Sequence, residues 1–198
     1  MPEDTSPQDL KARLSLIESM IAEGRRTTAK WGWTFVVWGV AFYIALAWST
    51  WGAKAEFSWP ITMVAAALIT SVLVSRQAHS GAQTAMSRAV GSVWIATGVA
   101  LFVVLASLGF SGRLDPHIFI AVLGGILGAT NAMSSMILKW RMQFACAVVW
   151  WATSIAACFT SGKQTMIVFL VAIFFCQIVF GIYGMIKESR PTTGAAHA

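Results

Sequence analysis

The sequence predicts an all-α fold, an integral membrane bundle of six transmembrane helices preceded by a cytoplasmic amphipathic helix. The first observation is composition: the 198-residue chain is 57% hydrophobic and only 11% charged, whereas soluble domains are about 25% charged. The second is the length of the apolar segments, because a helix needs roughly 20 apolar residues to cross a hydrocarbon core about 30 Å thick. Six segments qualify, at 31–49, 58–75, 90–110, 116–138, 143–160 and 165–186.

The third observation is that the basic residues lie at the ends of these segments. With a cytoplasmic N-terminus, three of them fall outside (Lys54, Arg113 and Lys163) and eleven fall inside: Lys11, Arg13, Arg25, Arg26, Lys30, Arg76, Arg88, Lys139, Arg141, Lys187 and Arg190. This positive-inside bias predicts six spans with both termini in the cytoplasm. It also argues against a nucleic-acid partner, because the net charge of +6 is not gathered on one folded face.

The chain divides into three regions. Residues 1–30 form a polar N-terminal region with an amphipathic helix and a basic linker, 31–188 form the six-helix transmembrane domain, and 189–198 form a short polar tail that we expect to be disordered. The longest internal loop is the polar segment 76–88. The six spans leave no room for a soluble domain.

Residues 7–23 are predicted to form an amphipathic helix, with Gly24 as its stop or hinge. The apolar residues of one face are spaced by four, three and four positions: Leu10, Leu14, Ile17 and Ile21. One hypothesis places this helix on the membrane surface, where Arg25, Arg26 and Lys30 meet anionic lipid, or packs it beneath the bundle. The other makes it an interface for a second copy or for a membrane or cytoplasmic protein.

The first span, Lys30–Ser49, contains the pair Trp38-Gly39, which we interpret as a helix-packing device because a buried indole N–H needs a partner. A shift of 59 residues places Gly39 on Gly98, with Val and Ala following in both copies. A weaker match places Trp150 on Trp38. These matches suggest three parallel helical hairpins, although two apolar helices can also match by chance.

The span 116–138 holds a GxxxG motif, Gly124 and Gly128, of the kind that lets two helices approach closely. Asn131 follows on the same helix, and Gln177 and Thr97 are polar residues of other spans. We expect Asn131 to face the bundle interior and to bond to another helix, with Gln177 as a candidate partner. The alternative is that these three side chains line a path for a polar solute.

Reactive groups are scarce. No Asp, Glu, Lys, Arg or His lies deep in a predicted span, where such residues mark proton and ion paths. No motif for phosphate, zinc or haem binding and no catalytic triad is present, so we expect no catalytic residue, no metal and no cofactor. One outward cluster, Arg113, Asp115 and His117, could sense acidic pH; the simpler interpretation is that Asp115-Pro116 begins a helix.

The segments LIESMIAEGRRTTAKWGWTFVVWGV (16–40) and SSMILKWRMQFACAVVWW (134–151) resemble a group of small bacterial six-helix membrane proteins of unassigned function. The Trp-Gly-rich hairpins are also similar, in architecture only, to the acid-resistance membrane protein family. Neither resemblance implies a catalytic motif, so no functional residue is carried over to this chain.

These observations predict a protein that is not an enzyme and acts in the lipid bilayer through helix–helix or partner association, in a role related to stress. The alternative is a small transporter or channel for a neutral or apolar solute, with Asn131, Thr97 and Gln177 along its path. A closed bundle favours association, whereas a continuous cavity that reaches Asn131 and Gln177 favours transport.

Overall fold

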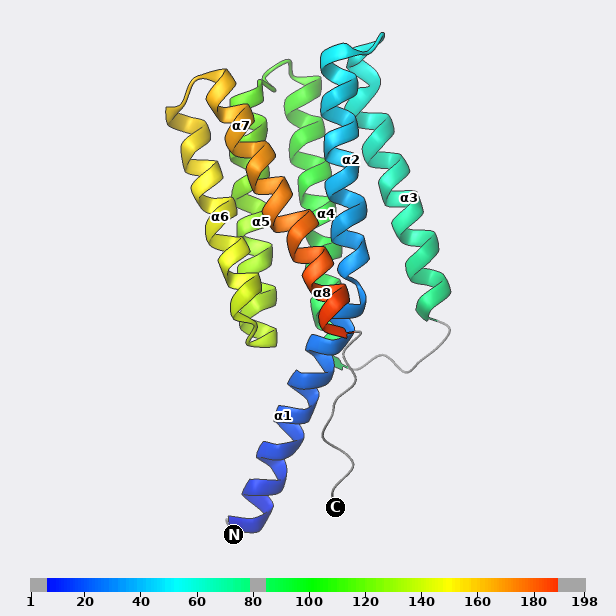
Figure 1. Cartoon of the computed structure of the whole chain (residues 1–198), viewed down its shortest axis with the longest axis vertical. Helices are drawn as coiled ribbons and strands as arrows, with labels where there is room; N and C mark the ends of the chain where they lie inside the picture. Colours follow the sequence, from blue (N-terminus) through cyan, green and yellow to red (C-terminus); the bar gives the residue numbers. More distant parts are fainter. Residues whose placement is uncertain (1–6, 79–84, 189–198) are drawn as a thin grey trace.

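The computed structural model describes residues 7–78 and 85–188, and all secondary structure in that part of the chain is helical (Figure 1). An N-terminal helix precedes six membrane-length helices. The elements are α1 (Pro7–Lys30), α2 (Gly32–Trp51), η1 (Ala55–Phe57), α3 (Ser58–Ala78), α4 (Ala85–Phe110), α5 (Pro116–Leu138), α6 (Arg141–Phe159), α7 (Gly162–Ile173), η2 (Phe174–Val179) and α8 (Phe180–Glu188). The predicted fold class is therefore confirmed, with α7, η2 and α8 forming one continuous sixth span over Gly162–Lys187. The expected tail, 189–198, lies outside the described residues.

Two predicted boundaries are wrong. Residues 76–88 were expected to form one polar loop, but α3 continues to Ala78 and α4 already begins at Ala85. Both helices extend into the polar segment because a helix forms its backbone hydrogen bonds internally, whether its side chains are apolar or polar. Gly24 does not stop α1, which runs on to Lys30. An added Cβ at Gly24 would lie 2.7 Å from Met86 Cγ and 3.0 Å from Leu138 Cδ2, so this glycine allows α1 to pack against α4 and α5.

The most extensive helix contact joins α5 and α6, which run antiparallel. Gly124 and Gly128 both face α6. A Cβ at Gly124 would lie 2.9 Å from the carbonyl oxygen of Trp150, and one at Gly128 would overlap the indole of Trp151. Ser154 Oγ of α6 donates a hydrogen bond to the Ala121 carbonyl oxygen of α5, at 2.7 Å. The repeat hypothesis assigns α5 and α6 to different hairpins, so it does not describe the tightest pair.

Helix α2 lies between α3 and the sixth span and contacts both. Gly32 and Gly181 bring α2 and α8 together, because a Cβ at Gly32 would lie 2.5 Å from the Gly181 carbonyl oxygen. Gly39, seven residues further along α2, also contacts the sixth span, because a Cβ added there would lie 2.9 Å from Cβ of Gln177. Its proposed equivalent Gly98 has nothing within 4 Å of an added Cβ. Among the described residues, no helix packs against Gly98, so its predicted packing role is not seen within this part of the chain.

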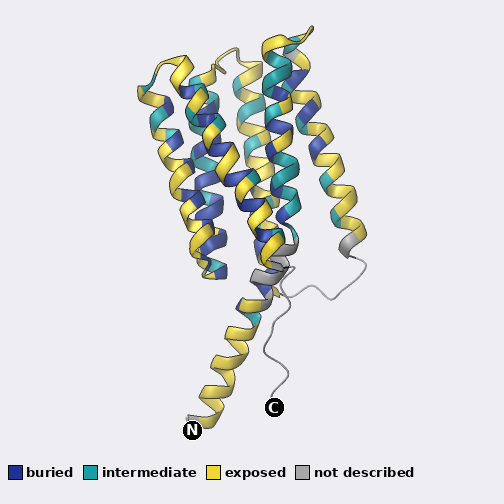
Figure 2. Ribbon diagram, viewed as in Figure 1, coloured by how far each residue is buried: buried dark blue, intermediate teal, exposed yellow. Residues whose placement is uncertain are grey.

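Helices α3 and α4 lie at the periphery of the bundle and expose most of their apolar surface (Figure 2). Their exposed large apolar residues are Ile61, Val64, Leu68, Ile69, Val72 and Leu73 on α3 and Ile95, Val99, Phe102, Val103, Val104 and Phe110 on α4. Water would make this surface costly, since each apolar side chain left exposed forgoes about 1.5–3 kcal/mol. Hydrocarbon removes that cost, so the exposure pattern is typical of helices that face lipid.

Aromatic rings fill the centre of the bundle in the half distant from α1. Four rings from four helices contact one another in a closed circuit: Phe42 of α2, Trp59 of α3, Phe119 of α5 and Phe169 of α7, with centroids 4.7 to 6.2 Å apart. Trp150 is fully buried beside Phe169. Trp38, by contrast, is half-buried, and no described aromatic ring is in contact with it. Its environment differs from that of Trp150, and the packing interpretation of Trp38 stays a prediction.

Candidate functional site

Buried polar side chains gather at the α5–α6 contact, in the half of the bundle nearer α1. Asn131 is 2% exposed and Gln143 of α6 is fully buried. Because the two helices run antiparallel from a turn at Lys139, Gln143 near the start of α6 lies level with Ser134 near the end of α5. Among the described residues, the buried polar atoms of this region without a hydrogen-bond partner are Asn131 Oδ1, Ser134 Oγ, Trp140 Nε1 and both amide atoms of Gln143; Trp150 Nε1, at the middle of α6, is a further one.

Asn131 does not bond to another helix, which corrects the prediction. Its Nδ2 donates to the Leu127 carbonyl oxygen at 2.8 Å, one turn earlier on α5. Among the described side chains, no hydrogen bond joins Asn131 to Gln177. Gln177 is buried on the other side of the sixth span, against Gly39 of α2. The two amides predicted to share one interior site are therefore placed in different helix contacts.

Thr97 supplies the interhelical bond that was expected of Asn131. Its Oγ1 lies 2.7 Å from Thr130 Oγ1, which joins α4 to α5. Each hydroxyl also lies within hydrogen-bond distance of a carbonyl oxygen of its own helix, that of Val93 for Thr97 and that of Ile126 for Thr130. Because each hydroxyl has one proton, one threonine donates to the other while the second donates to its own carbonyl oxygen. With its side chain engaged in this way, Thr97 holds two helices together and is not free to line a path.

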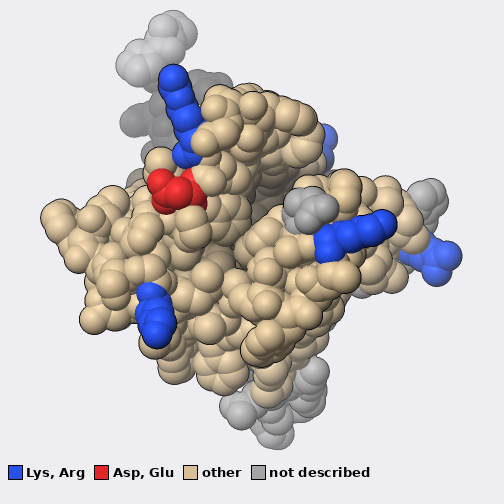
Figure 3. Space-filling view, turned by 90° about the horizontal axis from the view of Figure 1, so that it is seen from above, with Lys and Arg blue, Asp and Glu red and all other residues tan. Residues whose placement is uncertain are grey.

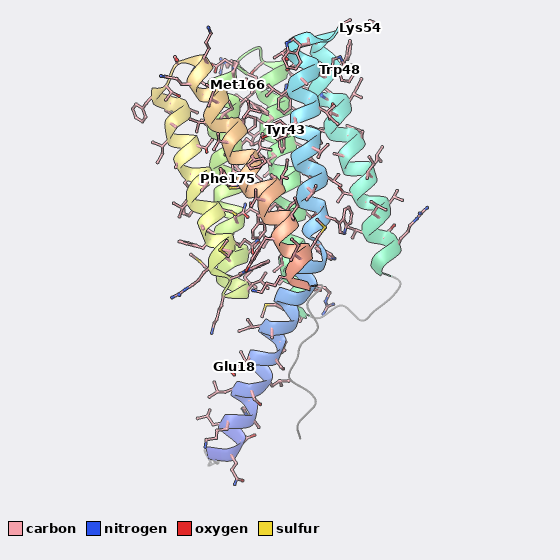
Figure 4. All side chains as sticks on the ribbon, in the orientation of Figure 1. Glu18, Tyr43, Trp48, Lys54, Met166 and Phe175 are labelled. Atoms are coloured by element: carbon pink, nitrogen blue, oxygen red, sulfur yellow. The ribbon has the colours of Figure 1, made fainter. Side chains whose placement is uncertain are left out.

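The sixth span widens into a π-helical segment, η2, at Phe174–Val179, and Gln177 lies within it. Such segments inside α-helices are rare and frequently occur at functional sites. Just before it, the Tyr43 hydroxyl of α2 donates a hydrogen bond to the Leu170 carbonyl oxygen, at 2.8 Å. Figure 4 shows Tyr43 directed from α2 toward the sixth span. The contact of α2 with this irregular segment therefore combines close packing at Gly39 with a polar bond.

The outward cluster Arg113, Asp115 and His117 does not assemble into a charged site. Asp115 caps α5, since its Oδ1 accepts from the backbone N–H of His117 at 2.8 Å and of Ile118 at 2.9 Å. The His117 ring turns toward α6, with Nδ1 2.9 Å from the Ala157 carbonyl oxygen. A carbonyl oxygen only accepts, so Nδ1 carries the proton. Arg113 is exposed, and this end of the molecule shows few charged side chains (Figure 3).

A shallow basic hollow of about 420 Å³ lies at the α5–α6 turn, at the end of the bundle that carries α1. Its lining is Ser135, Met136, Lys139, Trp140, Arg141 and Phe144. Lys187 of α8 lies beside it, with Nζ 5.8 Å from the centroid of the Trp140 ring. Neither Asn131 nor Gln177 lines this hollow, so it does not continue into the interior along the predicted polar path.

The apolar face of α1 is exposed outside the spans. Leu10, Leu14 and Ile17 are 56%, 54% and 51% exposed, whereas Ile21 is only 8% exposed because it packs against the bundle. Helix α1 extends away from the end of the bundle and does not lie across it (Figure 1). Glu18 is well separated from the bundle in Figure 4. The side chains of Arg25, Arg26 and Lys30, expected near anionic lipid, lie outside the described part of the structure.

Within residues 7–78 and 85–188, no group of three or more His, Cys, Asp or Glu side chains is placed to hold a metal ion. The three cysteines, Cys146, Cys158 and Cys176, are free thiols. Cys176 Sγ lies 3.7 Å from the Cys146 carbonyl oxygen, a contact between η2 and α6. Cys146 and Cys176 are buried, whereas Cys158 is exposed.

Gln143 is the buried polar residue that the sequence interpretation missed. It lies two residues after Arg141, where a membrane-surface position was expected, so it was not counted among the interior amides. The signal that could have found it is helical spacing, because Gln143, Ala147, Trp150 and Ser154 fall on one face of α6, and that face contacts α5. Spacing alone does not show which face is buried.

Comparison of the chain with protein-family models, with curated proteins and with solved structures finds no match. The resemblances drawn from residues 16–40 and 134–151 are therefore neither supported nor contradicted by these comparisons. Any function must be argued from the geometry of the chain itself.

Proposed function

We propose that this chain is a non-enzymatic, multi-pass protein of the bacterial cytoplasmic membrane that acts by associating with another protein through α1. The observation that carries this proposal is the apolar face of α1, held clear of the bundle with Leu10, Leu14 and Ile17 exposed. A solvated helix gains its stability from covering such a face. The architectural likeness to the acid-resistance membrane protein family supports a role related to stress.

The distribution of charge supports an orientation with α1 in the cytoplasm. The described basic side chains at the α1 end are Lys11, Arg13, Arg76, Arg88, Lys139, Arg141 and Lys187; those at the other end are Lys54, Arg113 and Lys163. Positive charge is retained on the cytoplasmic side of bacterial membranes. Both α1 and the end of α8 lie at the same end of the bundle (Figure 1), so this orientation places both of them on the cytoplasmic side.

The interior supports association over transport. The hydroxyls of Thr97, Ser154 and Tyr43 form bonds between helices, and the circuit of four aromatic rings occupies the centre of the half distant from α1. A solute path would need these groups to separate. The bundle is therefore best described as a support that presents α1 at the membrane surface.

A photo-crosslinking amino acid introduced into α1 tests the proposal in native membranes. Leu14 lies on the exposed apolar face, and Leu16, which is 61% exposed, lies about 200° away around the helix and serves as the matched control. We expect protein adducts when the crosslinker replaces Leu14 and few when it replaces Leu16. Adducts at neither position, or equal adducts at both, would reject α1 as a specific interface.

The second candidate function is a small channel or transporter for neutral solutes. The specific observation in its favour is the group of buried, unpaired polar atoms of Asn131, Ser134 and Gln143, which could bind water or a polar solute. Its test is the permeability of proteoliposomes to glycerol and urea, measured by light scattering. Transport predicts a rate above that of empty liposomes that falls in Asn131→Leu, whereas rates equal to those of empty liposomes count against it.

A further inference from the structure

We propose that the apolar face of α1 is covered by α1 of a second copy of this chain, in a parallel helix pair. The inference rests on the proposed associative function and names the partner for the surface that carries it. Three features favour this pair: the spacing of the apolar residues, the orientation that a membrane imposes, and the charges that flank the face.

The apolar spacing is that of a short coiled coil. Intervals of four, three and four between Leu10, Leu14, Ile17 and Ile21 assign Leu10 and Ile17 to heptad position d, and Leu14 and Ile21 to position a. Ile21 is already buried against its own bundle. The pairing surface therefore consists of three layers, Leu10, Leu14 and Ile17, which lie beyond the bundle.

Membrane insertion fixes the direction of pairing. Copies that insert with the same orientation project α1 from the same side of the membrane, so two such helices meet in parallel. Three apolar layers form a weak coiled coil in isolation. Anchoring both copies in one bilayer raises their effective concentration, which allows a weak helix pair to form.

The flanking charges complement each other in that parallel arrangement. With Leu14 at position a, Arg13 occupies position g and Glu18 occupies position e. In parallel coiled coils a residue at g faces the residue at e five positions later on the neighbouring helix. Arg13 of each copy therefore faces Glu18 of the other, which gives two oppositely charged pairs. Both side chains are exposed and available, although Arg13 also contacts Asp9 of its own helix at 3.0 Å.

The same charges disfavour an anionic membrane as the occupant. The largely exposed part of α1, residues 7–22, contains two acids, Asp9 and Glu18, and two bases, Lys11 and Arg13, which cancel to zero net charge; the basic residues Arg25, Arg26 and Lys30 follow only at the end of α1 that adjoins the bundle. Helices that lie on anionic lipid carry an excess of Lys and Arg on their polar face. Helix α1 also extends away from the bundle end, so its apolar face does not lie along the membrane plane (Figure 1).

Charge reversal in the full-length chain tests this pairing. Donor- and acceptor-labelled copies, with Ser19→Cys as the label site and Cys146, Cys158 and Cys176 replaced by Ala, are mixed in phosphatidylethanolamine–phosphatidylglycerol liposomes. Energy transfer is then followed as lipid dilutes the protein. We expect Arg13→Glu and Glu18→Arg, each alone, to weaken self-association about tenfold, since two attractive pairs become repulsive.

The decisive result is rescue. A mixture of Arg13→Glu copies with Glu18→Arg copies restores both opposite-charge pairs, so energy transfer should return to the level of the unmodified chain. The double variant Arg13→Glu/Glu18→Arg should also recover. Asp9→Lys is the matched control: it removes the same intrahelical ion pair but lies at heptad position c, outside the paired face, and should leave energy transfer unchanged.

Absence of rescue in the mixture, or an equal effect of Asp9→Lys, overturns the parallel pair. Quenching of a Leu14-site fluorophore by a lipid-borne quencher also overturns it, because the face then lies in the bilayer. The two proposals fail separately. If the crosslinker at Leu14 captures a different protein and energy transfer does not respond to the charge changes, the self-pairing is rejected and the associative function stands. If no crosslinks specific to Leu14 form, both proposals are rejected.

Discussion

At the residue scale, the surroundings of each polar side chain decide whether it holds helices together. Thr97 and Asn131 are both nearly buried, yet Thr97 bonds to Thr130 of the next helix while Asn131 bonds only to its own helix. The two residues differ in position, because Thr97 lies where α4 and α5 are close enough for its hydroxyl to contact Thr130 directly. Interhelical hydrogen bonds in membranes contribute about 0.6 kcal/mol on average, so one such bond adds only modestly to a helix contact that packing largely determines.

Thr97→Val should therefore lower the free energy of unfolding by about 0.5–1.5 kcal/mol, since it removes the α4–α5 bond while keeping the side-chain shape. Thr70→Val is the matched control, because the Thr70 Oγ1 is buried without a partner and the substitution should be neutral or stabilising. Reversible unfolding in bicelles measures both variants. Equal stability of Thr97→Val and the unmodified chain would show that the bond contributes nothing.

At the scale of elements, close contacts between helices depend on single glycines whose neighbours cannot move. The α5–α6 pair brings the backbone of Trp150 within 2.9 Å of where a Cβ at Gly124 would lie. A carbonyl oxygen of a helix backbone cannot rotate away as a flexible side chain can. The adjacent Gly125 has more room, because its added Cβ would lie 3.6 Å from Ser154 Oγ.

Gly124→Ala should destabilise the bundle by about 1–3 kcal/mol, the usual cost of overfilling a packed contact. Gly125→Ala should leave stability unchanged or raise it by up to about 1 kcal/mol, because alanine favours the helix. Melting temperatures of the two purified variants in the same detergent give the comparison. If both variants melted alike, the close approach of α5 and α6 would not depend on Gly124.

At the scale of the whole molecule, six membrane-length helices present basic residues mainly at the end that carries α1. By the positive-inside rule, this charge asymmetry predicts the orientation that the associative proposal requires, with α1 in the cytoplasm. Helices α3 and α4 form the lipid-facing periphery, and the contact of α5 with α6 forms the densest part of the bundle.

Single cysteines in a chain otherwise free of cysteine test this orientation. Ser111→Cys lies in the exposed turn between α4 and α5, and Ser15→Cys lies on exposed α1. A membrane-impermeant maleimide added to intact spheroplasts should label Ser111→Cys and should label Ser15→Cys only after lysis. The opposite pattern would invert the topology and place α1 outside.

The all-helical membrane class and its six spans follow from the sequence alone. The length of an apolar segment and the position of its flanking charges are local properties, and they determine whether the segment crosses a bilayer and in which direction. Helical spacing in the sequence also identifies the apolar face of α1. Which polar residues meet depends on the tertiary structure. In it Thr97 bonds to Thr130 and Gln143 is buried. Asn131 and Gln177 lie in different helix contacts, and no neighbour covers Gly98 among the described residues. In a helix that is apolar all round, spacing does not reveal which face meets a neighbour; that depends on how the other helices pack, and no single segment encodes it.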